Sequence, residues 1–509
     1  MVQNTNIYGT FASENFVPKN QAFYLPVRYV FGVMGMLGVM VAYMMRACLS
    51  IAITRMVVPI PPSTNQSIPP EDVCPGTDNI VVVDHSSWKT QVGQFEWSET
   101  TQGVILSAFY YGYILTHIPG GLLAQKFGGK HTLGFGILST ALFTLLTPIV
   151  AYQGSTALII LRFLEGVGEG TTFPALCTML AQWAPPNERS TLSTAAFTGV
   201  QIGTVLANLL GGVILEYMPT GWEAVFYIFG TVSVIWFLFW TVLCYNDPNS
   251  HPFITEREKL FLKETIGQTE RNKDLGPMPW KAILTSAPVW ALVIGEVGHD
   301  WALYTMVSDL PKYMSDVMKF NPAANGILSA LPYFATWIAS LSSSALADYI
   351  LKRNYASTTF IRKLFATIGS VGPAIGVICA SYVGCDRVAA TVFFTIGMAL
   401  MGTCYCSLRV NALDLSPNYS GTIMAFVNGA GCISGMLTPY FTGLLTPNRT
   451  VKEWRVVFWI MVVILISTNI VYVMFGSGDQ QDWNEPKIQE TPKSSQSKNN
   501  TEKEGVTKV

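Results

Sequence analysis

The segment Arg162-Phe-Leu-Glu165-Gly-Val-Gly-Glu169-Gly170 places one cation and two carboxylates inside a stretch whose flanks are mostly apolar or small. A charge at bilayer depth costs about 2.5–3.5 kcal/mol on insertion scales, so such groups face a bundle interior or a wet cavity. Positions 162, 165, 166, 169 and 173 recur at spacings of three and four, and therefore share one helical face. This polar stripe predicts an ion or solute pathway, with a purely structural, charge-paired stripe as the alternative.

Composition supports a membrane protein. Half of the 509 residues are hydrophobic and 12% are charged, against about 25% charged in soluble globular chains. The net charge of −1 offers no basic surface for nucleic acid. The first 21 residues lack a signal-peptide pattern. No Cys/His cluster has metal-ligand spacing, and most of the 9 cysteines lie in apolar runs.

A spanning helix needs about 20 apolar residues, and twelve such windows can be marked. The fold class is therefore all-α, with twelve transmembrane helices. The windows are 28–56, 98–123, 131–152, 155–181, 191–217, 223–245, 288–316, 323–350, 359–384, 388–413, 419–445 and 454–476.

The polar segment 246–287 divides these windows into two six-helix halves, 28–245 and 288–476. Within this linker, Thr255-Glu-Arg-Glu258 reads as a capping box that opens a short amphipathic helix. The tail 477–509 is rich in Lys, Glu, Ser and Asn, which predicts disorder. The linker shows no recognisable chemistry.

Charged loops predict the orientation. Lys and Arg gather in the loops on the side of the linker, whereas the opposite loop, 57–97, is acidic. By the positive-inside rule, the tail 1–27 and the C-terminal tail are both cytoplasmic. Asn65 and Asn448 then begin outward-facing glycosylation sequons. Cys74 and Cys385 also fall outside, where a disulfide between them is conceivable but not established by sequence.

The two halves resemble one another at an offset of roughly 230 residues, the kind of internal repeat to look for before assigning a fold. Gly121-Leu-Leu-Ala-Gln125 recurs as Ser344-Ala-Leu-Ala-Asp348, and Trp222-Glu-Ala-Val-Phe-Tyr227 recurs as Trp454-Arg-Val-Val-Phe-Trp459. A third match pairs Ala184-Pro-Pro-Asn187 with Leu415-Ser-Pro-Asn418. All three occur in order at equivalent helix ends. Pseudo-symmetric halves of six helices are the architecture of one large class of transporters.

The stretch from Gly121 to Lys130 resembles the cytoplasmic loop motif of the major facilitator superfamily. Small residues there allow close helix packing, and cations at the inner surface can pair with a carboxylate or a helix end. The resemblance implies a cytoplasmic gate motif made of Gly121, Lys126, Gly128, Lys130 and Asp348. The acidic residue usual in the first half is replaced by Gln125, which predicts a weaker latch in that half.

A closer resemblance is to the anion:cation symporter family, which contains sodium–phosphate cotransporters, sialin and the vesicular glutamate transporters. The pattern is nearest to the inorganic phosphate cotransporters and sialin. It covers nearly all of residues 27–484. The stretches that carry it are Tyr43–Ala52, Tyr111–Gly121, Arg162–Pro174, Trp183–Arg189, Trp301–Thr305, Leu310–Met314, Asn411–Pro417, Leu445–Asn448 and Glu453-Trp454.

This resemblance implies that Arg46 meets an anionic substrate. The sequence agrees, because Arg46 lies well inside its apolar window, although capping a helix or pairing with a carboxylate is the alternative. Arg162 corresponds to a family arginine but lies near a window end, where it could snorkel instead. Tyr111 and Tyr304 are candidate cavity hydroxyls, with simple packing as the alternative.

Glu165 and Glu169 are the candidate cation-coupling residues. A carboxylate poised to bind and release a proton is what a symporter needs, and Na⁺ held by the same oxygens is equally compatible. A buried salt bridge is the alternative for Glu169. The family pattern is broken at Asp300, where Asn is usual, and near Cys177, where many members carry a histidine.

These observations predict a secondary transporter that carries small anions, such as inorganic phosphate or organic carboxylates, with Na⁺ or H⁺. It has no cofactor, and its partners are the solute, the coupling cation and the bilayer. A non-transporting anion receptor on the same scaffold is the alternative. An enzyme is disfavoured because no nucleophile elbow, phosphate loop or paired-histidine motif occurs. The plasma membrane is favoured, since the N-terminal tail lacks an acidic dileucine signal; the oligomeric state cannot be read.

Overall fold

The computed structural model describes residues 26–58, 74, 93–185, 189–218, 221–267, 279–416 and 419–484. Asn65 and nearly all of both tails lie outside these residues. Within them the chain forms helices, joined by short connections and one isolated bridge between Val57 and Phe95. The predicted all-α class is confirmed.

The first half contains eight helical segments, and the linker contributes α9 and α10. The segments of the first half and linker are α1 (Val27–Met56), α2 (Glu99–Phe127), α3 (Gly129–Ala151), α4 (Ser155–Glu169), α5 (Thr172–Trp183), α6 (Arg189–Phe197), α7 (Gly199–Tyr217), α8 (Trp222–Leu243), α9 (Glu256–Gly267) and α10 (Trp280–Thr285).

The second half repeats the arrangement. Its segments are α11 (Ala287–Asp316), α12 (Pro322–Lys352), α13 (Thr358–Tyr382), α14 (Arg387–Met401), η3 (Gly402–Cys406), α15 (Leu408–Leu415), α16 (Ser420–Leu445), α17 (Val451–Phe475) and η4 (Asp482–Asn484). The twelve predicted windows agree with these bounds to within four residues.

Seven of the described helical segments are long and apolar enough to cross a membrane by length and composition alone. The other five crossings are α2, α4 with α5, α11, α12 and α16. They are interrupted, or they carry more polar, charged and small residues. Charged and polar residues inside such helices face a protein interior or a cavity rather than lipid.

Three crossings expected to be continuous are interrupted: the fifth by a single turn at Thr198, between α6 and α7, and two others near their middle. The fourth breaks at Gly170 and Thr171, between α4 and α5, and the tenth narrows to the 3₁₀ segment Gly402–Cys406. Gly170 and Gly402 lie 232 residues apart, close to the offset of the sequence repeat. Pro174, which has no backbone N–H to donate, follows the first break, and Thr403 and Ser407 at the second bind carbonyl oxygens of α13.

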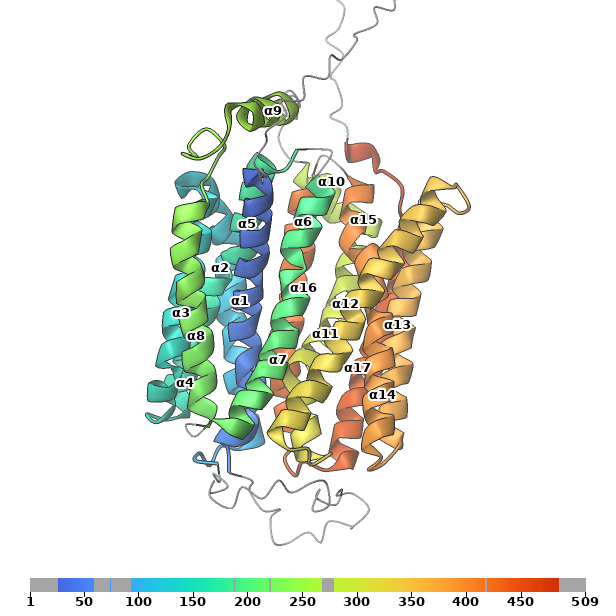
Figure 1. The fold of residues 1–509 in the computed structure, drawn as a ribbon. Coiled ribbons are helices and arrows are strands. Elements are labelled where there is room, and N and C mark those ends of the chain that lie inside the picture. Colours follow the sequence, from blue (N-terminus) through green and yellow to red (C-terminus); the bar gives the residue numbers. More distant parts are fainter. Residues whose placement is uncertain are drawn as a thin grey trace, which may run out of the picture.

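The two halves lie side by side, with the blue-to-green helices beside the yellow-to-red ones (Figure 1). Close contacts between them join α2 to α16 and α7 to α12. Both of these helix–helix contacts depend on glycine. A Cβ on Gly103 would strike the backbone at Pro439, and one on Gly212 would strike the backbone at Gly326. Small residues let helices approach closely in membranes.

The molecule has two distinguishable ends. At the end bearing α9 and α10 (Figure 1), here called the linker end, Glu258 of α9 accepts hydrogen bonds from the backbone N–H groups of Val27 and Arg28 at 3.0 and 3.2 Å. Thr255 caps α9 as predicted, through a 3.4 Å bond from the N–H of Glu258. At the opposite, loop end, a disulfide joins Cys74 to Cys385.

Candidate functional site

Arg46 of α1 and Glu169, the last residue of α4, form an ion pair in the interior of the first half. Arg46 is only 4% exposed, and its Nη2 lies 2.5 Å from Glu169 Oε1. The guanidinium carbon lies 4.4, 4.5 and 4.9 Å from the ring centroids of Tyr43, Tyr113 and Phe109. Aromatic faces attract cations, so these rings hold the guanidinium without neutralising it.

Glycines bring the rings of α2 to this arginine. A Cβ on Gly112 of α2 would strike the carbonyl oxygen of Phe163, and one on Gly166 of α4 would strike that of Phe109. The two helices therefore touch backbone to backbone, which places Phe109 and Tyr113 close to the α4 carboxylates. Glycine within the segment 162–170 thus allows the close helix packing that positions the charged residues of the same segment.

Arg162 forms a second pair with Glu165, one helical turn along α4. Thr147 of α3 donates to Glu165 Oε1 at 3.1 Å, and Arg162 donates to the carbonyl oxygen of Arg46 at 3.4 Å. Arg162 is buried, so its side chain does not snorkel to the membrane surface. The predicted stripe is confirmed as a buried face of α4 for Arg162, Glu165, Gly166 and Glu169, whereas Phe173 lies beyond the break, in α5, and is half-buried.

Several polar atoms of the first pair remain available. Nε and Nη1 of Arg46 and Oε2 of Glu169 have no hydrogen-bond partner among the described residues. Buried donors without acceptors are costly. The arrangement can therefore bind an anion at Arg46, and the carboxylate of Glu169 can take a cation in exchange for its arginine partner.

One of the two candidate tyrosines is buried in the structure, and the other is exposed. Tyr304 of α11 is buried and packs edge-on against Tyr110 of α2 at 4.8 Å, joining the halves at mid-membrane. Tyr111 of α2 is 51% exposed, so it is not buried in the interior as Tyr304 is, and its contact with substrate stays a prediction. Successive helical residues point 100° apart, and the interior positions belong to Tyr110 and Tyr113.

A second charged cluster, in the second half, was not predicted. Arg409 of α15 pairs with two carboxylates of α11 through Nη2, Glu296 at 2.8 Å and Asp300 at 3.1 Å. Its Nη1 donates to Asn428 of α16 at 2.5 Å. The signal that marks Arg162 in the sequence, a charge inside an apolar window, applies equally to Glu296 and Arg409 and would have found them.

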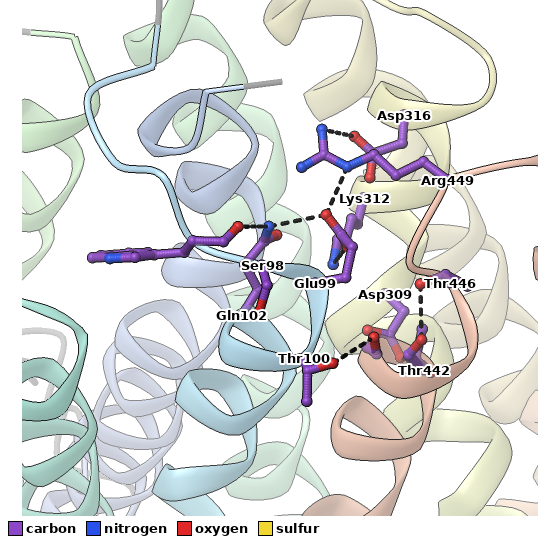
Figure 2. Close-up of polar contacts among 12 residues, drawn as sticks. Ser98, Glu99, Thr100, Gln102, Asp309, Lys312, Asp316, Thr442, Thr446 and Arg449 are labelled. Atoms are coloured by element: carbon purple, nitrogen blue, oxygen red, sulfur yellow. Dashed lines mark hydrogen bonds and ion pairs between the residues drawn. The ribbon is translucent and has the colours of Figure 1, made fainter. Parts of the chain in front are cut away.

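Charged side chains also join the halves at the loop end (Figure 2). Glu99 of α2 pairs with Lys312 of α11, and Nε of Arg449 lies 2.6 Å from Glu99 Oε1. Arg449 Nη1 also lies 3.7 Å from Asp316. Nearby, Thr442 donates to Asp309 at 2.9 Å. The ion pairs that involve Glu99 therefore link the two halves at this end.

The predicted gate residues lie at the linker end. Gly128, with φ of 89°, ends α2, and Lys130 Nζ lies 3.8 Å from the ring centroid of Tyr245. Lys126 contacts the ring of Phe127, and Asp348 is exposed on α12. A Cβ on Gly121 would be in ordinary contact with Pro174. Both lysines thus contact aromatic rings of their own half, and a gating role stays a prediction.

Asn448 is exposed at the loop end, where its side chain donates to Glu453 at 2.7 Å. Its glycosylation remains a prediction.

A family model described as Major Facilitator Superfamily matches residues 35–439. Sialin of Homo sapiens is 40% identical over 463 residues, 90% of each chain. The chain belongs to the major facilitator superfamily and, within it, to the anion:cation symporter family. A Drosophila melanogaster member provisionally named an inorganic phosphate cotransporter is 38% identical over 91% of this chain and 87% of its own. Vesicular glutamate transporter 1 of Bos taurus is 34% identical over 91% and 79%.

Solved structures of the superfamily share the fold. A bacterial homolog of the human lysosomal transporter Spinster, inward-facing and occupied, gives a TM-score of 0.64 at 14% identity, covering 89% of this chain and 97% of the other. The Escherichia coli xylose transporter XylE, inward open, gives 0.63 at 14% identity, covering 88% and 96%. The protein is therefore an integral multi-pass membrane transporter of a small solute and not an enzyme.

Proposed function

We propose that this protein is a secondary active transporter that couples the movement of a small anion, such as inorganic phosphate or an organic carboxylate, to Na⁺ or H⁺. The observation that carries the proposal is the buried Arg46–Glu169 pair, 2.5 Å apart. A guanidinium at membrane depth attracts negative charge, and Arg46 has donors without hydrogen-bond partners beside its contact with Glu169. Relatives named as sialin and as phosphate or glutamate transporters support an anionic solute.

Coupling follows from competition for Arg46. While Glu169 is ionised, it satisfies the arginine; once it binds a proton or Na⁺, the arginine can pair with the substrate anion instead. The anion therefore binds best together with the cation, which is the requirement for symport. Arg162 and Glu165 form a balanced pair beside this site and assist it. The halves would then rock about the site.

We further propose that both termini are cytoplasmic and that the plasma membrane is the site of action. The Lys and Arg content of the loops at the linker end supports this orientation. The Cys74–Cys385 disulfide at the loop end supports it independently, because disulfides persist in oxidising compartments. Asn65 and Asn448 would then be open to glycosylation.

Uptake into proteoliposomes tests the proposal. Radiolabelled phosphate and a panel of organic anions would be offered under an inward Na⁺ or H⁺ gradient. We expect uptake driven by one gradient, lost in Arg46→Ala and in Glu169→Gln. Arg55→Ala is the matched control, because Arg55 lies on the same helix but is partly exposed, 3.8 Å from Glu216. Folded protein that accumulates no anion under either gradient would refute symport and favour an anion receptor.

A further inference from the structure

The charged cluster of the second half carries one more negative than positive charge. Glu296 and Asp300 share a single guanidinium, that of Arg409. Glu296 is 0% exposed and Asp300 is 2% exposed, whereas the Arg409 side chain is 25% exposed. The first half, by contrast, holds two cations and two carboxylates. Uncompensated charge at membrane depth is costly, so the second cluster requires one additional positive charge.

The neighbouring groups of α11 and η3 do not supply that charge. His299, on the same face of α11 as Glu296 and Asp300, is buried, and neither ring nitrogen has a hydrogen-bond partner among the described residues. Its ring packs edge-on against Tyr405 at 6.0 Å, and the guanidinium of Arg409 lies over the same ring. A charged imidazole placed beside Arg409 would be repelled.

The other titratable groups around the cluster are neutral, with the exception of Arg46 of the first half. The neutral groups are Cys404 and Tyr405 of η3, Cys432 of α16, Tyr304 of α11 and, from the first half, Tyr43. Among the described residues, Arg46 is the one further cation near Asp300, and it is already paired with Glu169. The charge that balances the cluster must therefore be bound.

We propose that Glu296 and Asp300 together bind one proton at neutral pH, which makes the Glu296–Asp300–Arg409 cluster a second proton site, in the second half. A metal cation fits less well: no group of three or more His, Cys, Asp or Glu in the described part of the chain could hold one. The guanidinium also lies within 3.1 Å of both carboxylates and would repel a metal ion. The proton passes between bulk water and a carboxylate oxygen, with no bond broken other than O–H.

The proposal rests on the proposed function only for its consequence in transport. By the competition argued for Arg46, a proton on either carboxylate loosens its hold on Arg409. The exposed part of that guanidinium can then meet the transported anion. Loss of the proton restores the pair. The second half would thus couple one additional proton to each anion.

Infrared difference spectroscopy of the purified full-length protein tests the site without transport. Wild-type protein is expected to show the C=O stretch of a protonated carboxyl group at neutral pH, identified by its shift in D₂O. Glu296→Gln and Asp300→Asn each leave one carboxylate for one guanidinium, so either variant should fold. In each variant the area of the protonated-carboxyl band should fall by the contribution of one group. Glu216→Gln, at a partly exposed position of α7, is the control that should leave the band unchanged.

Two results would overturn the proposal. One is a band of equal area in wild type and in both single variants. The other is a carboxylate spectrum of the cluster that responds to Na⁺ but not to pH, which would assign the charge to sodium. A band that behaves as expected in protein that transports no anion would leave the proton site standing while refuting the proposed function. In an active protein, each variant should move one proton fewer per anion, measured from the reversal potential.

Discussion

The carboxylate of Glu169 pairs with Arg46. In the proposed mechanism it also accepts the coupling cation, and these two roles compete. Glu169→Gln should abolish accumulation driven by a gradient but preserve exchange of anion for anion, because the arginine remains. Breaking a buried pair at one side costs about 3–5 kcal/mol, so the melting temperature should fall. Paired uptake and counterflow assays with thermal unfolding check this.

The double variant Arg46→Met with Glu169→Met separates stability from function. Replacing both members of a buried pair by apolar residues is often neutral, so this variant should recover stability relative to either single change while remaining inactive. If it were as unstable as Glu169→Gln alone, lost packing rather than an unpaired charge would explain the single variant.

Sequence periodicity predicted which residues of α4 share a face, but not every side chain that meets them. Glu165 and Glu169 are buried as expected, because a carboxylate inside a membrane-spanning helix is costly in lipid and therefore faces the protein interior. Burial of Tyr111 could not be predicted, because α2 carries three tyrosines close together and composition does not show which of them faces the interior. Arg409 was not predicted as a site residue, because the window 388–413 was identified only by the length of its apolar run.

At the scale of helices, the close contact between α2 and α4 can be tested by adding a single carbon atom. Gly166→Ala adds a Cβ that would strike the carbonyl oxygen of Phe109. The helices must separate, which costs about 1–3 kcal/mol and withdraws the rings from Arg46. We expect a lower melting temperature and weaker anion binding. Gly429→Ala on α16, where a Cβ meets nothing within 4 Å, should leave both unchanged.

The linker helix α9 is fixed to the start of α1 by one carboxylate. Glu258 accepts from two backbone N–H groups and lies 3.1 Å from Arg28 Nη1. An anion at a helix N-terminus is stabilising, so Glu258→Gln should release α9. Hydrogen–deuterium exchange should accelerate in 256–267 and in 26–30. The same change at the exposed Glu256 should not accelerate it; equal effects would contradict a specific contact.

Helix positions were predictable to a few residues because lipid demands long apolar segments with internally bonded backbones. The interruptions at Gly170 and at Gly402–Cys406 were not predicted. A break of one or two residues barely changes the hydropathy of a window, and its geometry depends on contacts with α13 and with Pro174. These breaks lie beside Glu169 and Arg409, so local sequence reasoning fails where the two charged clusters are built.

For the whole molecule, the Glu99 network should set the balance between the two access states. Glu99 of the first half holds Lys312 and Arg449 of the second, and Glu99→Gln removes the charge that both share. Each 1.4 kcal/mol lost from the closed state changes the ratio of states about tenfold. Spin labels at Tyr217→Cys and Val388→Cys, both exposed at the loop end on opposite halves, should report a growing long-distance population.

Glu223→Gln is the matched control, because Glu223 lies at the same end but accepts its 2.5 Å hydrogen bond from Tyr152 within the first half. The disulfide between Cys74 and Cys385 stays intact in both variants, so any movement occurs with that link in place. An unchanged distance distribution in Glu99→Gln would mean that the glycine-based crossings of α2 with α16 and of α7 with α12 close the loop end without help from charge. A shift confined to Glu99→Gln would make the ion pairs the closing device.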